Sequence, residues 1–311
     1  MNPLLLLRLA WADALERVRR SSFLLTVGTT VWLGSLVYTD NIQMWIGEFR
    51  GAVNSAWIGT VMALSATTFA SLAGFYIVKN AVDRDRRTGV GQILAATRVT
   101  TAGYLLAKWL SNSAVLGAIV LTLMGAALVL HVVQARNVPL DVVALLAPLV
   151  FLALPAMAAV AACAVVFETV PLLSGGFGNA AYFFLWSAAL TAPLATQAGW
   201  ADWSGISVVE SSLAAAVRAV APGAELGLSF TAGPTKDLSH LTVVDWTGIR
   251  WTLSVVGLRL AWIAASVVAA AGAALWFDRF DTVRTTAAPR LRTGRVRARV
   301  HAGRETSRRQ G

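Results

Sequence analysis

Charged residues are scarce in this chain of 311 residues. Asp, Glu, Lys and Arg together make up 14% of it and hydrophobic residues make up 57%, and the mean hydropathy is +0.64. A soluble domain carries about 25% charged residues, because its surface faces water. The shortage of charge therefore excludes a soluble domain, and most of the surface is expected to face lipid.

Cysteine and histidine are also scarce. The single cysteine, Cys163, excludes an intramolecular disulfide, and the three histidines (His131, His240 and His301) lie too far apart in sequence for a zinc motif. The chain has no P-loop for nucleotide binding and no G-x-S-x-G hydrolase turn. We therefore predict no catalytic residues, no metal site and no nucleotide hydrolysis by this chain itself.

Apolar stretches are abundant. A membrane-spanning helix needs about 20 mainly apolar residues, and six stretches reach or approach that length: 22–38, 56–78, 103–130, 142–167, 179–196 and 252–276. Pro148, Pro155 and Pro193 fall inside these stretches and predict kinks there. The predicted fold class is an all-α integral membrane protein with six transmembrane helices, in one membrane domain over residues 1–280.

Residues 3–20 predict an amphipathic helix and no cleavable signal peptide. The apolar run 4–7 ends at Arg8 and is shorter than the core of such a signal. Leu4, Leu7 and Trp11 share one face by their spacing, and Asp13 and Arg17 share the other. We expect this helix to lie flat on the inner face of the membrane; the alternative is an ordinary leading helix of a cytosolic cap.

The 26 basic residues predict the orientation of the chain. They exceed the 16 acidic ones, for a net charge of +10, and most lie before the first span, between the second and third spans, or after the last. Because Lys and Arg favour cytoplasmic loops, both termini are predicted to be cytoplasmic. Residues 281–311 are predicted to be a basic, disordered tail without aromatic residues for base stacking. Anionic lipid is its expected partner, and nucleic acid is not.

Three further features lie in or near the last three spans. Arg259 is a charge inside the last span, and we favour a side chain that extends to the outer headgroups over a place on the substrate path. Glu168, at the inner end of the fourth span, is expected to be solvated or to pair with an Arg. The outer segment 197–250 is too long to lack structure. It predicts a small cap or a re-entrant helix pair, with a surface loop carrying one amphipathic helix as the alternative.

The connection between the second and third spans carries charges of both signs close together. Its order is Asp83, Arg84, Asp85, Arg86, Arg87, Thr88 and Gly89, then Gln92, Ile93 and Leu94, then Thr97 and Arg98, and finally Tyr104 and Lys108. Mixed charges around a small apolar anchor suit a docking surface for another protein. A solvated loop that only follows the positive-inside bias is the alternative.

This order and spacing resemble the first cytosolic loop in permease subunits of type-2 ABC transporters, an exporter class with six spans per subunit. The resemblance also covers the leading helix, the six-span layout and the long outer segment, over roughly residues 1–280. It implies a plasma membrane of the bacterial inner-membrane type, a second permease copy or paralogue, and a separate ATPase subunit that binds ATP and magnesium. No cofactor would be bound by this chain.

The resemblance also implies which residues couple the spans to the ATPase, all of them within the 79–101 loop. They are Asp83, Arg84, Asp85, Arg86, Arg87, Thr88, Gly89, Gln92, Ile93, Leu94 and Arg98. The expected function is the membrane subunit of an ATP-driven exporter. A non-transporting membrane anchor or scaffold is the first alternative, and an integral-membrane enzyme is the second.

Overall fold

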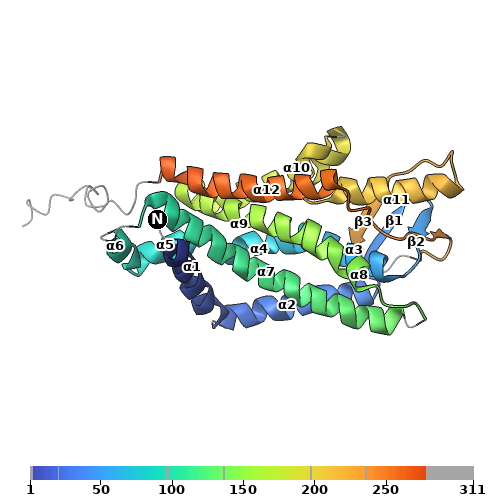
Figure 1. Cartoon of the computed structure of the whole chain (residues 1–311), viewed down its shortest axis with the longest axis horizontal. Coiled ribbons are helices and arrows are strands. Elements are labelled where there is room, and N and C mark those ends of the chain that lie inside the picture. Colours follow the sequence, from blue (N-terminus) through green and yellow to red (C-terminus); the bar gives the residue numbers. More distant parts are fainter. Residues whose placement is uncertain are drawn as a thin grey trace, which may run out of the picture.

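The computed structural model is mostly helical and describes residues 3–19, 21–95, 97, 99–135, 137–196, 198–234 and 237–277. Long helices run side by side along the molecule (Figure 1). They are α2 (Ser21–Tyr38), α3 (Ser55–Ser65) with η1 (Ala66–Ala70) and α4 (Ser71–Val78), α7 (Thr101–Gln134), α8 (Val142–Pro148) with η2 (Leu149–Ala153) and α9 (Leu154–Thr169), and α12 (Leu253–Gly272) with η4 (Ala273–Leu275). The helix α10 (Gly176–Thr196) is tilted away from them (Figure 1). The predicted tail at 281–311 lies outside the described residues.

Four helices are long and apolar enough to cross a membrane. Within the described part of the chain these are Ser55–Arg87, Thr101–Gln134, Val142–Thr169 and Leu253–Leu275. They indicate a membrane protein, as the composition predicts. The other two predicted spans correspond to α2 and α10, which are helical but are not among these four.

The second and fourth predicted spans each contain a π-helical turn, η1 and η2, and these two turns contact each other. Pro148 and Pro155 flank η2. Because proline has no backbone N–H, it cannot continue the α-helical hydrogen bonding, and the helix deviates there as expected. The two helices also approach closely, since a Cβ added to Gly59 would lie 2.0 Å from the carbonyl oxygen of Leu145.

One end of the molecule gathers α1 (Pro3–Val18), α5 (Ala81–Arg87), α6 (Val90–Ala95) and the end of α12 (Figure 1). Helix α1 packs against α7 and leaves Leu4, Leu7 and Trp11 exposed. Its polar residue Asp13 turns toward the protein instead of toward solvent. An exposed apolar face with a buried polar face suits a helix lying on a membrane surface.

The opposite end carries a small β-sheet, so the all-α prediction is wrong at this point (Figure 1). Its strands are β1 (Ile42–Ile46), β2 (Phe49–Gly51), β3 (Leu228–Ala232) and β4 (Thr242–Val244), in the order β3-β1-β2-β4. β1 is antiparallel to β2 and β3, and β2 is parallel to β4. The predicted cap is therefore built by two connections distant in sequence, 38–55 and 197–250, which are joined where β1 pairs with β3 and β2 pairs with β4.

The outer segment also contains η3 (Gly199–Ala201) and α11 (Ile206–Val220). Val209, Leu213 and Val217 are fully buried along one side of α11. This matches the helical spacing of apolar residues in the sequence. The segment is thus a structured cap of one amphipathic helix and two strands.

Candidate functional site

Helix α5 begins directly after the second predicted span, 56–78, and is anchored by a carboxylate from another helix. Asn80 adopts a left-handed conformation (φ 74°) that turns the chain out of α4. The Glu168 carboxylate, at the end of α9, accepts hydrogen bonds from the backbone N–H groups of Ala81 at 3.1 Å, Val82 at 2.6 Å and Asp83 at 3.3 Å. A negative charge at a helix N-terminus is favourable, because free N–H groups and the helix dipole point toward it.

The expectation that Glu168 is solvated is therefore wrong. Its side chain is 5% exposed, because α5 folds back over the end of α9 and covers it. Glu168 fixes the start of α5 to the fourth predicted span. No sequence pattern around residue 168 signals this, since its three partners lie more than 80 residues earlier.

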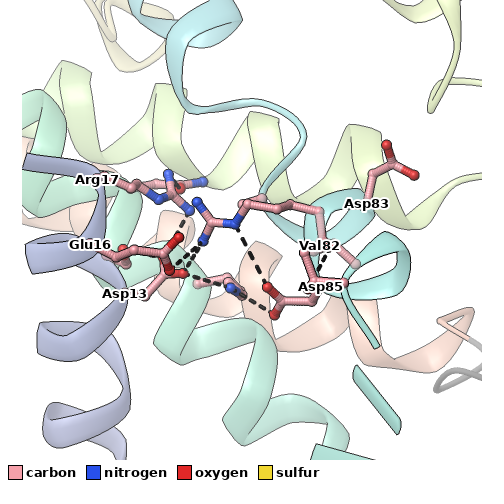
Figure 2. Close-up of polar contacts among 12 residues, drawn as sticks. Asp13, Glu16, Arg17, Val82, Asp83 and Asp85 are labelled. Atoms are coloured by element: carbon pink, nitrogen blue, oxygen red, sulfur yellow. Dashed lines mark hydrogen bonds and ion pairs between the residues drawn. The ribbon is translucent and has the colours of Figure 1, made fainter. Parts of the chain in front are cut away.

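The other side of α5 faces a group of five charged residues, which we call the charge cluster: Asp13, Arg17, Arg84, Asp85 and Lys108 (Figure 2). They come from α1, α5 and α7. Asp13 lies at the centre, 2.9 Å from both Arg17 Nη2 and Lys108 Nζ, and it also pairs with Arg84. One carboxylate thus serves three cations.

Lys108 joins the two acidic residues of the cluster. Its Nζ lies 2.9 Å from Asp13 Oδ1 and 2.8 Å from Asp85 Oδ2, and Tyr104 Oη donates a hydrogen bond to Asp85 at 2.8 Å. The side chains of Lys108 and Asp85 are each 7% exposed. Through these contacts Lys108 of α7 is linked to Asp13 of α1 and Asp85 of α5. Separating the three helices would leave a buried charge without its partner, which is costly.

The electrostatics of the cluster keep Asp13 ionised. Burial raises the pKa of Asp13, but the positive charges of Arg17 and Lys108 and the hydrogen bond from Ser111 outweigh burial and lower the pKa well below its usual range. Ser111 Oγ donates to Asp13 at 2.5 Å. This carboxylate therefore acts as a fixed anchor for cations and does not exchange a proton near neutral pH.

The remaining residues of α5 face away from the cluster. Arg87 and Asp83 form an exposed pair at 2.7 Å, with side chains 80% and 40% exposed, and Arg86 lies over the ring of Phe277 at 5.4 Å. Gly89 has a φ of +75°, which lets the chain turn between α5 and α6.

The predicted coupling residues therefore separate into different environments. Asp83, Arg86, Arg87, Thr88, Gly89 and Gln92 are exposed or half-buried. Arg84 and Asp85 are turned inward into the charge cluster, and Ile93 and Leu94 belong to α6. Arg98 lies outside the described residues.

The sequence placed Asp13 and Arg17 on the polar face of the leading helix but did not connect them to the 79–101 loop. Tyr104 and Lys108 were recognised only as part of the family-like pattern. One signal in the sequence points to this cluster. The leading helix, the 79–101 loop and the start of the third predicted span are all expected at the cytoplasmic face, so Asp13, Asp85 and Lys108 would lie at the same depth.

Arg259 pairs at the sheet-bearing end of the molecule. Its guanidinium Nη2 lies 3.0 Å from Asp202 Oδ2, and Nη1 donates to the Asp202 carbonyl oxygen. Asp202 also accepts from the backbone N–H of Gly205 at 2.8 Å, just before α11. Arg259 is 0% exposed, so the prediction that it extends to the headgroups is wrong. The pair ties α12 to the cap, and a place on a substrate path stays a prediction.

Among the described residues, no group of three or more His, Cys, Asp or Glu side chains could hold a metal ion. No family model, curated protein or solved structure matches this chain. The function is therefore inferred from the geometry of the charge cluster and of α5.

Proposed function

We propose that this chain is the membrane-spanning permease subunit of an ATP-driven exporter of the type-2 ABC class, and that a separate ATPase subunit docks on α5 and α6. The observation that carries the proposal is the two-sided construction of α5. One side is exposed with charges of both signs, and the other is tied to three helices of the membrane domain. A segment that only connects two spans needs neither an exposed side with charges of both signs nor a buried side tied to three helices.

The exposed side suits a protein partner. Asp83, Arg86 and Arg87 offer both signs of charge within a single short helix, with Thr88 and Gln92 beside them. Electrostatic complementarity of this kind favours specific and rapid association. ATP and magnesium would bind in the partner, and this chain would contribute the docking surface.

The buried side would transmit movement from the partner to the membrane. Glu168 links α5 to α9, and Lys108 links Asp85 of α5 both to α7 and, through Asp13, to α1. Because α5 has seven residues and is held at these points, a displacement of α5 moves the attached helices with it. Two such permease subunits, either copies or paralogues, would form the substrate path between them.

The proposal includes six spans, cytoplasmic termini and a plasma membrane of the bacterial inner-membrane type. The positions of α1, α5, α6 and the end of α12 at one end of the bundle support it (Figure 1). In a Cys163→Ala background, a membrane-impermeant maleimide should label Val243→Cys on β4 in intact cells. It should label Thr88→Cys only after the membrane is opened. The reverse pattern would overturn the orientation.

The docking role is tested by co-purification with the ABC ATPases of the source organism. The double variant Arg86→Glu/Arg87→Glu should reduce the amount of ATPase recovered and its turnover at least about tenfold, since reversing charges at an interface costs several kcal/mol. Arg218→Glu is the matched control, because Arg218 is an exposed arginine on α11 at the opposite end.

Equal recovery of the ATPase with all three proteins, or no ATPase under conditions that preserve complexes, would contradict the docking role. Recovery of an ATPase whose turnover does not respond to the permease would instead support a non-transporting anchor.

A further inference from the structure

A second feature of the α5 region is a cavity that adjoins the proposed docking surface and shares Asp83, Arg87 and Thr88 with it. It has a volume of about 580 Å³ and lies beside α5, where α1, α2, α4 and α7 meet. Its apolar wall includes Ile77, Val78 and Val115 from the second and third predicted spans. Its charged lining consists of Arg17, Lys79, Arg84 and Arg87 with one acid, Asp83.

Basic residues outnumber acidic ones in the described lining of this cavity, where Asp83 is the one acid among four bases. Arg84 lies between this cavity and a neighbouring cavity of about 310 Å³, and its side chain lines both. Asp13, Glu16 and Asp85, the acids that pair with Arg84, line that neighbouring cavity together with Lys108, so acids outnumber bases there, whereas bases outnumber acids in the cavity beside α5. The cavity beside α5 is therefore the positive side of the charge cluster.

Among the described residues, the buried ammonium group of Lys79 has hydrogen-bond partners but no ion-pair partner, and one buried donor of Arg17 has no acceptor. Lys79 is 6% exposed, and its ammonium group contacts neutral oxygens: Asn179 Oδ1 at 2.7 Å and the carbonyls of Leu173 and Gly175, both at 3.4 Å. Within the described part of the chain it forms no ion pair. The buried Nε of Arg17 has no hydrogen-bond partner there either. Buried donors of this kind normally have an acceptor.

We propose that this cavity binds the phosphate headgroup of an anionic phospholipid, with an acyl chain along the apolar wall. Phosphate oxygens accept strong hydrogen bonds from Arg and Lys, and basic pockets between membrane helices are suited to anionic headgroups. The apolar wall favours a lipid over a soluble phosphate compound, because Ile77 and Val78 continue the second span directly into the basic part. Because the cavity and the proposed docking surface share Asp83, Arg87 and Thr88, lipid binding is measured on this chain alone, without an ATPase.

The test measures binding of phosphatidylglycerol to the purified, delipidated protein, with phosphatidylcholine as the neutral lipid. Lys79→Gln and Arg87→Gln should each weaken phosphatidylglycerol binding about fivefold, the factor that corresponds to about 1 kcal/mol per base. Arg86→Gln is the matched control, since Arg86 is an exposed arginine of the same helix that does not line the cavity. It should bind as the wild type does.

Three results would overturn the assignment: equal phosphatidylglycerol affinity in all four proteins, equal binding of phosphatidylcholine, or displacement of the lipid by millimolar inorganic phosphate. The last would assign the cavity to a soluble phosphate compound. Thermal unfolding of each variant serves as the folding control. Arg87→Gln keeps the test decisive if Lys79→Gln fails to fold, because the Arg87 side chain is 80% exposed.

Discussion

Replacing Lys108 by methionine tests whether the charge cluster holds the 79–101 loop to the rest of the protein. Lys108 Nζ contacts Asp13 at 2.9 Å and Asp85 at 2.8 Å, and the side chains of these acids are 12% and 7% exposed. Methionine keeps the length and the apolar stem of the side chain but removes its charge. Asp13 retains Arg17 and Arg84 as partners, whereas Asp85 retains the Tyr104 hydroxyl and an arginine at 4.0 Å.

The structure sets the size of the effect. Removing one partner of a buried ion pair costs about 3–5 kcal/mol. Because Asp13 keeps two cations, we expect the Lys108→Met loss to lie at the lower end, about 3 kcal/mol in the free energy of unfolding. Arg87→Met is the matched control on α5. This variant breaks the exposed Asp83–Arg87 ion pair, whose residues are four positions apart on the helix. Exposed pairs at this spacing contribute only about 0.3–0.5 kcal/mol to stability.

The assay is equilibrium unfolding in mixed detergent and SDS micelles, followed by circular dichroism. A second variant, Lys108→Met/Asp85→Asn, should recover about 1–2 kcal/mol, because it removes the unpaired charge and keeps an acceptor for Tyr104. The reasoning would be refuted if Lys108→Met were no more destabilising than Arg87→Met, or if Asp85→Asn added to the loss.

Three other predictions concern close packing, the anchoring of α5 and pH. Gly59→Ala should destabilise the protein by about 1–3 kcal/mol, because the added Cβ would lie 2.0 Å from the Leu145 carbonyl oxygen; Gly117→Ala, with nothing within 4 Å, should be neutral or stabilising in the same unfolding assay. Glu168→Gln should speed hydrogen exchange at the first amides of α5 by about tenfold or more, since a hydrogen bond to a charged group contributes about 1.5–3 kcal/mol; unchanged exchange would refute the anchoring. The lowered pKa of Asp13 means that its contribution to stability is complete above the ordinary carboxyl pKa of about 4 and is lost progressively as pH falls from there toward the lower native value. The difference in unfolding midpoint between wild type and Asp13→Asn should thus stay constant from about pH 7 to 5 and shrink below about pH 4; shrinkage already at pH 6 would contradict it.

The local pattern of apolar residues predicted the helices well where one physical requirement decides the secondary structure. An apolar run in lipid must satisfy its backbone hydrogen bonds internally, and this forces a helix. The run predicted at 142–167 forms one continuous helical stretch, Val142–Thr169. The leading amphipathic helix and the buried face of α11 were likewise predictable, because the spacing of apolar residues fixes which side is buried.

Contacts between distant segments were not predictable in this way. The strand character of β1 depends on pairing with β3, where Ile42 is opposite Ala232, and neither segment has a long alternating pattern of its own. The Arg259 environment depends on Asp202, 57 residues earlier. A lone arginine in an apolar run is compatible with extension to the headgroups until the partner is known.

By itself, the sequence determined the membrane class, the positions of the long helices and the gathering of charge between the second and third predicted spans, because these follow from hydropathy and local spacing. Only the tertiary structure decided which of those charges face outward. Asp83 and Asp85 are two residues apart on α5, yet one lies in an exposed pair and the other in the buried charge cluster. The difference arises because α1 and α7 pack against one side of α5, and side chains two positions apart on a helix point in different directions.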